Sequence, residues 1–81
     1  MQILVRFFSH LKEITGTAER TIDLPDGANV KDLLSRLYSS HPELQKWDNN
    51  ILIGAGVEFV ERDYRIRPDD EIAIMPPVQG G

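Results

Sequence analysis

The stretch that decides the fold is residues 69–81, which read DDEIAIMPPVQGG. The turn signal Pro68-Asp69-Asp70 is followed by a short apolar segment, so we expect a final strand over Glu71–Met75. Pro76 and Pro77 fix two φ angles and offer no N–H group, so this strand cannot continue beyond them. The chain is therefore predicted to leave the sheet as a stiff, extended tail over residues 76–81.

A strand is also predicted at the start of the chain, over Gln2–Phe8. Its side chains alternate, so three of them face a core: Ile3, Val5 and Phe7. Phe8 then lies on the opposite face. Glu19–Leu24 alternates in the same way and ends at the turn Pro25-Asp26-Gly27. We expect these two strands to form a hairpin-like pair.

Two helices are predicted from cap residues and apolar spacing. Ser9 can cap a short helix over His10–Ile14, and Gly16 stands where a left-handed residue ends it. Asn29 followed by Asp32 is typical of the start of a longer helix. The apolar residues of that main helix recur at helical spacing: Val30, Leu33, Leu34 and Leu37.

The segment after the main helix is less regular. Pro42 ends that helix, and residues 42–47 form a further helical turn before a loop over residues 48–50. Two short apolar strands follow, over Ile51–Ile53 and Val57–Val60, separated by a glycine-rich interruption. This order of elements predicts an α+β fold in which one main helix covers one face of a small sheet.

Composition limits the classes of function. A chain of 81 residues fits one domain, here residues 1–81. Its net charge of -4 disfavours nucleic-acid binding, which requires clustered Lys and Arg, and suits a partner with a basic surface. No apolar run approaches the roughly 20 residues that cross a bilayer, so we expect no membrane contact and a cytoplasmic location.

Side chains that carry chemistry are scarce. The chain has no cysteine, which excludes a disulfide framework, a cysteine zinc site and a thiol nucleophile. Neither His10 nor His41 belongs to a pair with metal-ligand spacing. We interpret both histidines as solvated surface residues, and we expect no metal site.

The last residues predict a different kind of working group. Gly80 and Gly81 lack Cβ atoms, so this end can enter a slot too narrow for side chains. We predict that the tail threads into another protein through five residues: Pro76, Pro77, Val78, Gln79 and Gly80. The C-terminal carboxylate of Gly81 is then the working group. Coupling it to AMP lets a persulfide sulfur attack the carbonyl, and the product is a thiocarboxylate. For two terminal glycines alone, a frayed end is the simpler alternative.

The whole chain resembles the small subunits of molybdopterin synthase, a family of sulfur carriers related to ubiquitin and to the thiamine-pathway sulfur carrier. Four segments carry the resemblance: ILVRFF (3–8), LKEITG (11–16), DDEIAIMPPV (69–78) and the final Gly80-Gly81. The resemblance implies a ubiquitin-like β-grasp fold. That fold has a mixed sheet of four to five strands, one main helix on one face and short extra helices.

The resemblance also implies a function in molybdenum cofactor biosynthesis. An E1-like enzyme would adenylylate Gly81 with ATP and magnesium, and a desulfurase or rhodanese-type protein would supply the sulfur. The thiocarboxylate would then enter the large subunit of molybdopterin synthase and pass its sulfur to cyclic pyranopterin monophosphate. The chain would bind no cofactor and supply no catalytic side chain, and would act as the sulfur-donating subunit of a sulfurtransferase.

The family docks through an apolar patch beside the tail. The matching positions here are Phe8, Phe59 and Met75, with Lys12 as a nearby basic contact. Phe8 and Met75 fall on the strand face opposite the predicted core, which exposes apolar area that a partner can cover. For Phe59, ordinary core packing is the alternative.

The chain departs from the family pattern at three places. Ile74-Met75 stands where Phe-Phe is frequent, Ala55-Gly56 where an Asn is frequent, and Asp69 where the turn often has Gly. Two other functions stay open. The first is a ubiquitin-like protein modifier or a sulfur donor for tRNA thiolation, which differs only in what receives the activated end. The second is a binding module whose tail is never activated.

Overall fold

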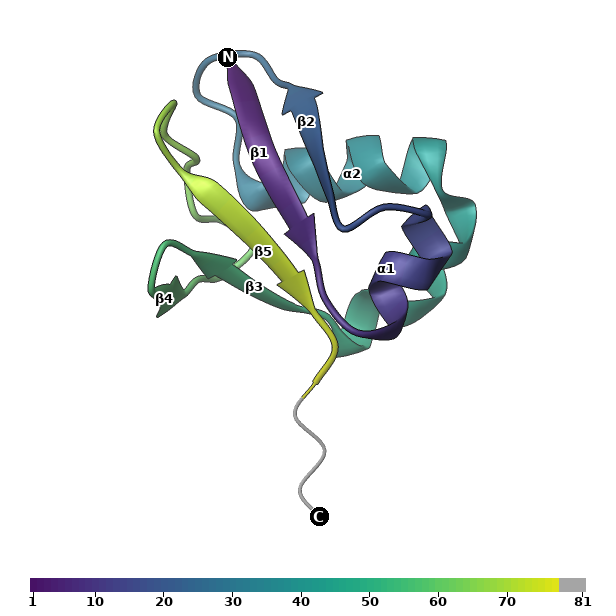
Figure 1. Ribbon diagram of the computed structural model, residues 1–81. Helices are drawn as coiled ribbons and strands as arrows, with labels where there is room; N and C mark the ends of the chain where they lie inside the picture. Colours follow the sequence, from purple (N-terminus) through teal and green to yellow (C-terminus); the bar gives the residue numbers. More distant parts are fainter. Residues whose placement is uncertain (78–81) are drawn as a thin grey trace.

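The computed structural model describes residues 1–77, which form a five-stranded sheet with helices against one face (Figure 1). The elements in chain order are β1 (Gln2–Phe7), α1 (His10–Thr15), β2 (Glu19–Asp23), α2 (Val30–Ser40), the 3-10 helix η1 (Pro42–Asn50), β3 (Leu52–Ala55), β4 (Glu58–Phe59) and β5 (Glu71–Met75). The strand order in the sheet is β2-β1-β5-β3-β4.

The sheet is mixed. Its central strands, β1 and β5, run parallel, with Leu4 opposite Glu71 and Phe7 opposite Ile74. The pairs β1–β2, β3–β5 and β3–β4 are antiparallel. Figure 1 shows α2 lying across one face of the sheet, while the other face carries no helix. This is the ubiquitin-like β-grasp arrangement, and the expected α+β class is confirmed.

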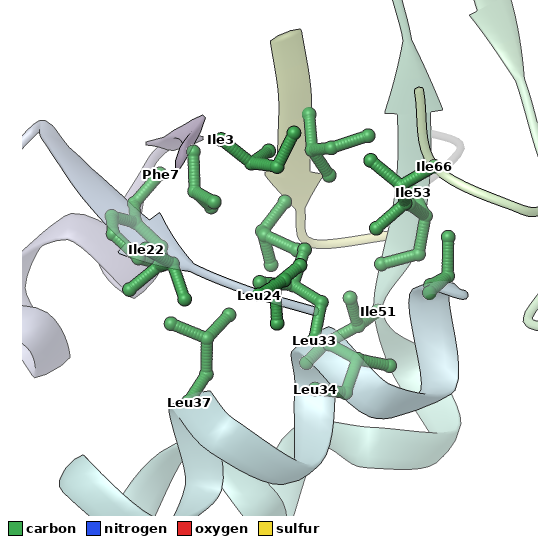
Figure 2. Close-up of a cluster of buried hydrophobic side chains, with 14 of the residues drawn as sticks. Ile3, Phe7, Ile22, Leu24, Leu33, Leu34, Leu37, Ile51, Ile53 and Ile66 are labelled. Carbon is green, nitrogen blue, oxygen red and sulfur yellow. The ribbon is translucent and has the colours of Figure 1, made fainter. Parts of the chain in front are cut away.

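The core lies between the sheet and α2. The predicted inward residues of β1 are at most 2% exposed: Ile3, Val5 and Phe7. The predicted apolar face of α2 is buried against them: Val30, Leu33, Leu34 and Leu37. Figure 2 shows several of these side chains meeting between the strands and the helix. Strand alternation and helical spacing therefore predicted both sides of the core correctly.

The ends of α2 also follow the sequence. Asn29 and Asp32 form a reciprocal capping box, in which the Asp32 N–H donates to Asn29 Oδ1 at 2.9 Å and the Asn29 N–H donates to Asp32 Oδ2 at 3.0 Å. The helix ends at Ser40, before Pro42. Two orphan N–H groups at the start of the helix are thus satisfied locally.

The prediction for residues 48–50 was wrong, because η1 continues through Asn50. Asp48 explains the difference. Its carboxylate accepts a hydrogen bond from the Tyr38 hydroxyl and one from Arg62 Nη1 at 2.7 Å, and its carbonyl accepts from Arg62 Nη2. The bond from Tyr38, followed by that from Arg62, lowers the pKa of Asp48, while burial and the Asp48 contact raise the pKa of Tyr38. These partners come from distant parts of the chain, so the local sequence does not reveal them.

The glycine-rich interruption after Ile53 was also predicted wrongly. β3 continues through Gly54 and Ala55, which pair with Ala73 and Ile72 of β5. The chain turns only at Gly56, whose φ of 63° is in the left-handed region that glycine adopts without strain. The strand expected over Val57–Val60 is reduced to β4.

Two predictions around α1 were wrong, although Gly16 ends the helix as expected, with a φ of 77°. Ser9 precedes the helix but makes no side-chain cap hydrogen bond. His10 is not a solvated surface residue: its ring centroid lies 4.5 Å from that of Trp47, and its Nε2 is buried without a hydrogen-bond partner among residues 1–77. The contact between α1 and η1 that covers His10 is tertiary, so its charged local sequence misled the prediction.

Within residues 1–77, no helix combines the length and the apolar character that crossing a bilayer requires.

Candidate functional site

The root of the predicted tail lies at the end of β5. The strand ends at Met75, as predicted, and Pro76 and Pro77 continue from it without N–H groups to extend the ladder. Both prolines are half-buried. The remaining predicted tail residues lie outside the part of the chain that the structure describes: Val78, Gln79, Gly80 and Gly81.

The helix-free face of the sheet borders this root. Ile72 and Ile74 of β5 point into the core, so Ala73 and Met75 point to the open face. Phe8, just after β1, donates its backbone N–H to the carbonyl of Ile74 at 3.1 Å. That bond holds Phe8 beside the last residues of β5.

The three apolar residues predicted for docking surround a hollow on the open face, which we call the apolar hollow. Its volume is about 290 Å³, and the residues that line it include Phe8, Phe59, Met75, Gly54 and Ala73. The Phe8 side chain is 44% exposed and that of Phe59 is 71% exposed. Core packing, the alternative for Phe59, is therefore wrong. The structure brings three separate segments of the chain together around one apolar surface.

Sequence reasoning missed Gly54, which forms part of the floor of this hollow. Gly54 lies opposite Ala73 on β5 and Phe59 on β4. A Cβ atom at this position would approach Met75 Cε to 3.3 Å and Ala73 Cβ to 3.7 Å. Gly54 and Ala73, two of the small residues of the lining, thus stand next to each other in adjacent strands, and this leaves the depression between the larger side chains. The sequence shows the glycine, but it does not show which residues lie opposite it in the adjacent strands.

Two exposed apolar residues near the hollow were also missed. Val57 stands at the β3–β4 turn with its side chain fully exposed, and it contributes to the lining. Leu52 pairs with Met75 across the sheet and is 36% exposed. The signal for Leu52 was its position one residue before the buried Ile53, because strand alternation then places it on the open face.

Residues 5–81 match the model of the ThiS family. The chain belongs to the ThiS family. It is 35% identical to the molybdopterin synthase sulfur carrier subunit of Chlamydomonas reinhardtii, with 100% of both chains covered. It is 34% identical to the human protein of the same name, with 99% of this chain and 94% of that one covered. Among solved structures, SAMP1 from Haloferax volcanii is 27% identical and has a TM-score of 0.87, with 100% of both chains covered.

The basic residue predicted for this ThiS-family surface, Lys12, lies on a second hollow. This hollow has a volume of about 210 Å³, and Phe8, Ser9, Lys12 and Arg6 contribute to its lining. Phe8 therefore borders both hollows. Arg6 is held between two carboxylates, Glu71 at 3.3 Å and Glu19 at 3.7 Å. Lys12 is exposed and forms no ion pair within residues 1–77.

The described part of this ThiS-family chain, residues 1–77, contains no group of three His, Asp or Glu side chains arranged to hold a metal ion. What it offers is a surface: an apolar hollow, a basic residue beside it, and the root of the tail at its edge. Such an arrangement can hold a partner protein in a fixed position relative to the tail.

Proposed function

We propose that this chain is a sulfur carrier that acts as the small subunit of molybdopterin synthase, with the C-terminal carboxylate of Gly81 as its working group. The observation that carries the proposal is the double role of Met75, which both ends β5 and lines the apolar hollow. A partner that covers the hollow therefore lies against the root of the tail. The algal and human relatives reported above, both named as sulfur carrier subunits of this synthase, support the same function.

The proposed chemistry takes place on the terminus. The Gly81 carboxylate attacks the α-phosphorus of ATP on an E1-like enzyme that uses magnesium, and pyrophosphate leaves. A persulfide sulfur of a desulfurase or rhodanese-type protein then attacks the acyl carbon and expels AMP. Cleavage of the resulting disulfide by a thiol leaves the thiocarboxylate. Because this activation consumes ATP, the cytoplasm is the proposed location.

The proposed acceptor is cyclic pyranopterin monophosphate in the active site of the large subunit. Phe8, Phe59 and Met75 dock on that subunit, with Lys12 as a basic contact. Pro76 to Gly80 then thread the thiocarboxylate into the active site. Docking far from the reacting atom supplies the positioning that makes the transfer effectively intramolecular.

A second candidate function is protein modification, favoured by the match to SAMP1 over the full length of both chains. Other chains of the same fold are named small archaeal modifier protein 1. The activation of Gly81 would be the same, but a lysine amine would attack the acyl carbon of the acyl-adenylate, expel AMP and form an isopeptide bond. Intact-protein mass spectrometry distinguishes the two functions, because a carrier gains sulfur in place of oxygen and a modifier appears as a covalent conjugate.

Deletion of Gly81 tests the working group. The deletion moves the carboxylate back by roughly 3.5 Å along an extended chain, and a misplacement of this size costs at least about 100-fold in rate. We expect sulfur loading to be lost while the melting temperature stays close to that of the parent. The measurement is mass spectrometry after incubation with the activating enzyme, ATP and a sulfur source.

Gly80→Val is the matched variant, because it keeps the carboxylate at its distance and adds a β-branched side chain to the tail. Loading should fall in this variant while binding to the large subunit persists. If the Gly81 deletion forms thiocarboxylate at the rate of the parent, the terminus is not the working group and the proposal is wrong.

A further inference from the structure

Ser9 adopts a backbone conformation that side chains disfavour. Its φ of 53° and ψ of -137° make it the one non-glycine residue with positive φ among residues 1–77. These angles are close to those of the first central residue of a type II′ turn, a position where glycine dominates. The turn is closed by the Leu11 N–H, which donates to the Phe8 carbonyl at 3.2 Å.

The Ser9 side chain makes no hydrogen bond within residues 1–77 that could offset this strain. As a helix cap it would accept a hydrogen bond from the first turn of α1, and no such bond forms. Its hydroxyl is exposed and has no hydrogen-bond partner among residues 1–77. Backbone strain that no local interaction explains is found mostly at functional sites.

The neighbourhood of Ser9 indicates what the hydroxyl can bind. Ser9 lies between Phe8, which borders the apolar hollow, and Lys12, with which it lines the second hollow. Both carboxylates near Arg6 are already engaged with its guanidinium, whereas Lys12 forms no ion pair in the described part of the chain. A residue with a hydroxyl donor and a residue with an ammonium donor thus line the same hollow, next to Phe8.

We propose that Ser9 and Lys12 together bind one carboxylate of the protein that docks on the apolar hollow. This inference rests on the proposed function, since it adds a polar contact to the same docking surface. A carboxylate can accept from both donors at once, and hydrogen bonds to a charged group are stronger than neutral ones. On a chain with a net charge of -4, an isolated basic contact fixes the register of the partner.

A double-mutant cycle with the large subunit tests the contact. Ser9→Ala removes the hydroxyl and keeps Cβ, and should weaken binding by about 3- to 10-fold in titration calorimetry. Lys12→Ala should weaken binding by a similar factor. If both donors hold one carboxylate, the double variant should weaken binding by less than the product of the two single factors. Ser40→Ala, at an exposed serine of α2, is the matched control and should bind like the parent.

Ser9→Gly tests the strain separately. Because glycine accepts positive φ, the Ser9→Gly chain should melt at a higher temperature than the Ser9→Ala chain, although both lose the hydroxyl and bind the large subunit more weakly. A lower melting temperature for Ser9→Gly would remove the strain argument and overturn the proposal.

The binding results have equally definite meanings. Parent-like affinity in Ser9→Ala, or factors that multiply in the double variant, would overturn the shared carboxylate while leaving the proposed function intact. A parent chain that does not bind the large subunit at all would overturn the proposed function and this contact with it.

Discussion

The two faces of the sheet differ in what their side chains do, although the same strands build both. On β5, Ile72 and Ile74 are fully buried in the core, whereas Ala73 and Met75 point to the face without a helix. Figure 1 shows this asymmetry directly, with α2 on one side only. Strand periodicity of two thus separates core residues from residues of the proposed docking surface along the five residues of β5. Substitutions on the covered face should therefore change stability and leave partner binding intact. Substitutions on the open face should do the reverse.

The open face is unusual for a chain this small because its exposed residues are large and apolar. Phe59 is 71% exposed and Val57 is completely exposed, and both line the same hollow as Phe8. Apolar patches of this kind on a monomer mark interaction sites. The covered face needs no partner, since α2 already removes its apolar surface from water.

The largest expected effect is on the covered face. Ile74→Ala deletes buried methyl groups and leaves a cavity in the core, so it should lower the free energy of unfolding by about 2–5 kcal/mol. Ala73→Ser, one residue earlier on the open face, should change it by no more than about 0.5 kcal/mol. Urea denaturation of both variants measures the difference. If both variants lose the same free energy of unfolding, the two faces do not differ in their contribution to stability.

A smaller effect, on binding alone, is expected for Phe8→Asp and Met75→Asp. Each places a charge that would lose water in the centre of an apolar contact, and this should cost about 2 kcal/mol of binding, or roughly 30-fold in Kd. The isolated variants should keep the melting temperature of the parent. Calorimetry with the large subunit and thermal melts measure the two properties.

A charge elsewhere provides the control for these two variants. Ser35→Asp introduces the same charge at an exposed position of α2 and should bind like the parent. If Phe8→Asp and Met75→Asp unfold instead, these residues belong to the core and the comparison of the two faces is wrong. If they bind like the parent, the hollow is not the docking surface.

The smallest expected effect is a dependence of stability on pH through Asp48. Its pKa in the folded chain is lowered from 3.8 by the hydrogen bond from Tyr38 and then by that from Arg62. The folded state therefore favours the ionised form. The resulting stabilisation is present above the unfolded pKa and is lost as pH falls through the lowered folded value.

Thermal melts between pH 2 and pH 7 test this sign. The melting temperature of the parent should fall further in acid than that of Asp48→Asn, because asparagine cannot ionise at this position. At neutral pH, Asp48→Asn should be the less stable chain, because Arg62 then loses its charged partner. If the melting temperatures of the two chains change with pH in the same way, Asp48 is not the source of the pH dependence. Binding to the large subunit should be unaffected, since Asp48 does not line the apolar hollow.

Much of the fold followed from local patterns because their causes are local. Alternation on β1 identified Ile3 and Val5 as core residues, and the capping pair Asn29 and Asp32 identified the start of α2. Pro76 ends the last strand because its ring fixes φ and leaves no N–H group for the sheet. Each of these features depends on residues at most a few positions apart.

The candidate site was predictable only in part. Phe8 and Met75 were assigned to the open face from alternation, but Phe59 was left undecided between surface and core. Phe59 is exposed on β4, which is an edge strand of the sheet, and the strand order is not readable from the local sequence. Gly54 gave a misleading signal, because its role as floor of the hollow depends on the strand that lies opposite.

The sequence by itself determined where β1, β2, β5 and α2 form, which of their residues are apolar, and where β5 must end. Only the tertiary structure decided which residues stand opposite one another: Gly54 against Ala73, Trp47 over His10, and Asp48 between Tyr38 and Arg62. It also decided that Ser9, at the N-cap position of α1, has a positive φ and forms no side-chain cap hydrogen bond. The physical reason is that periodicity and capping act within one or two turns of chain, whereas register and packing join segments that are far apart in sequence.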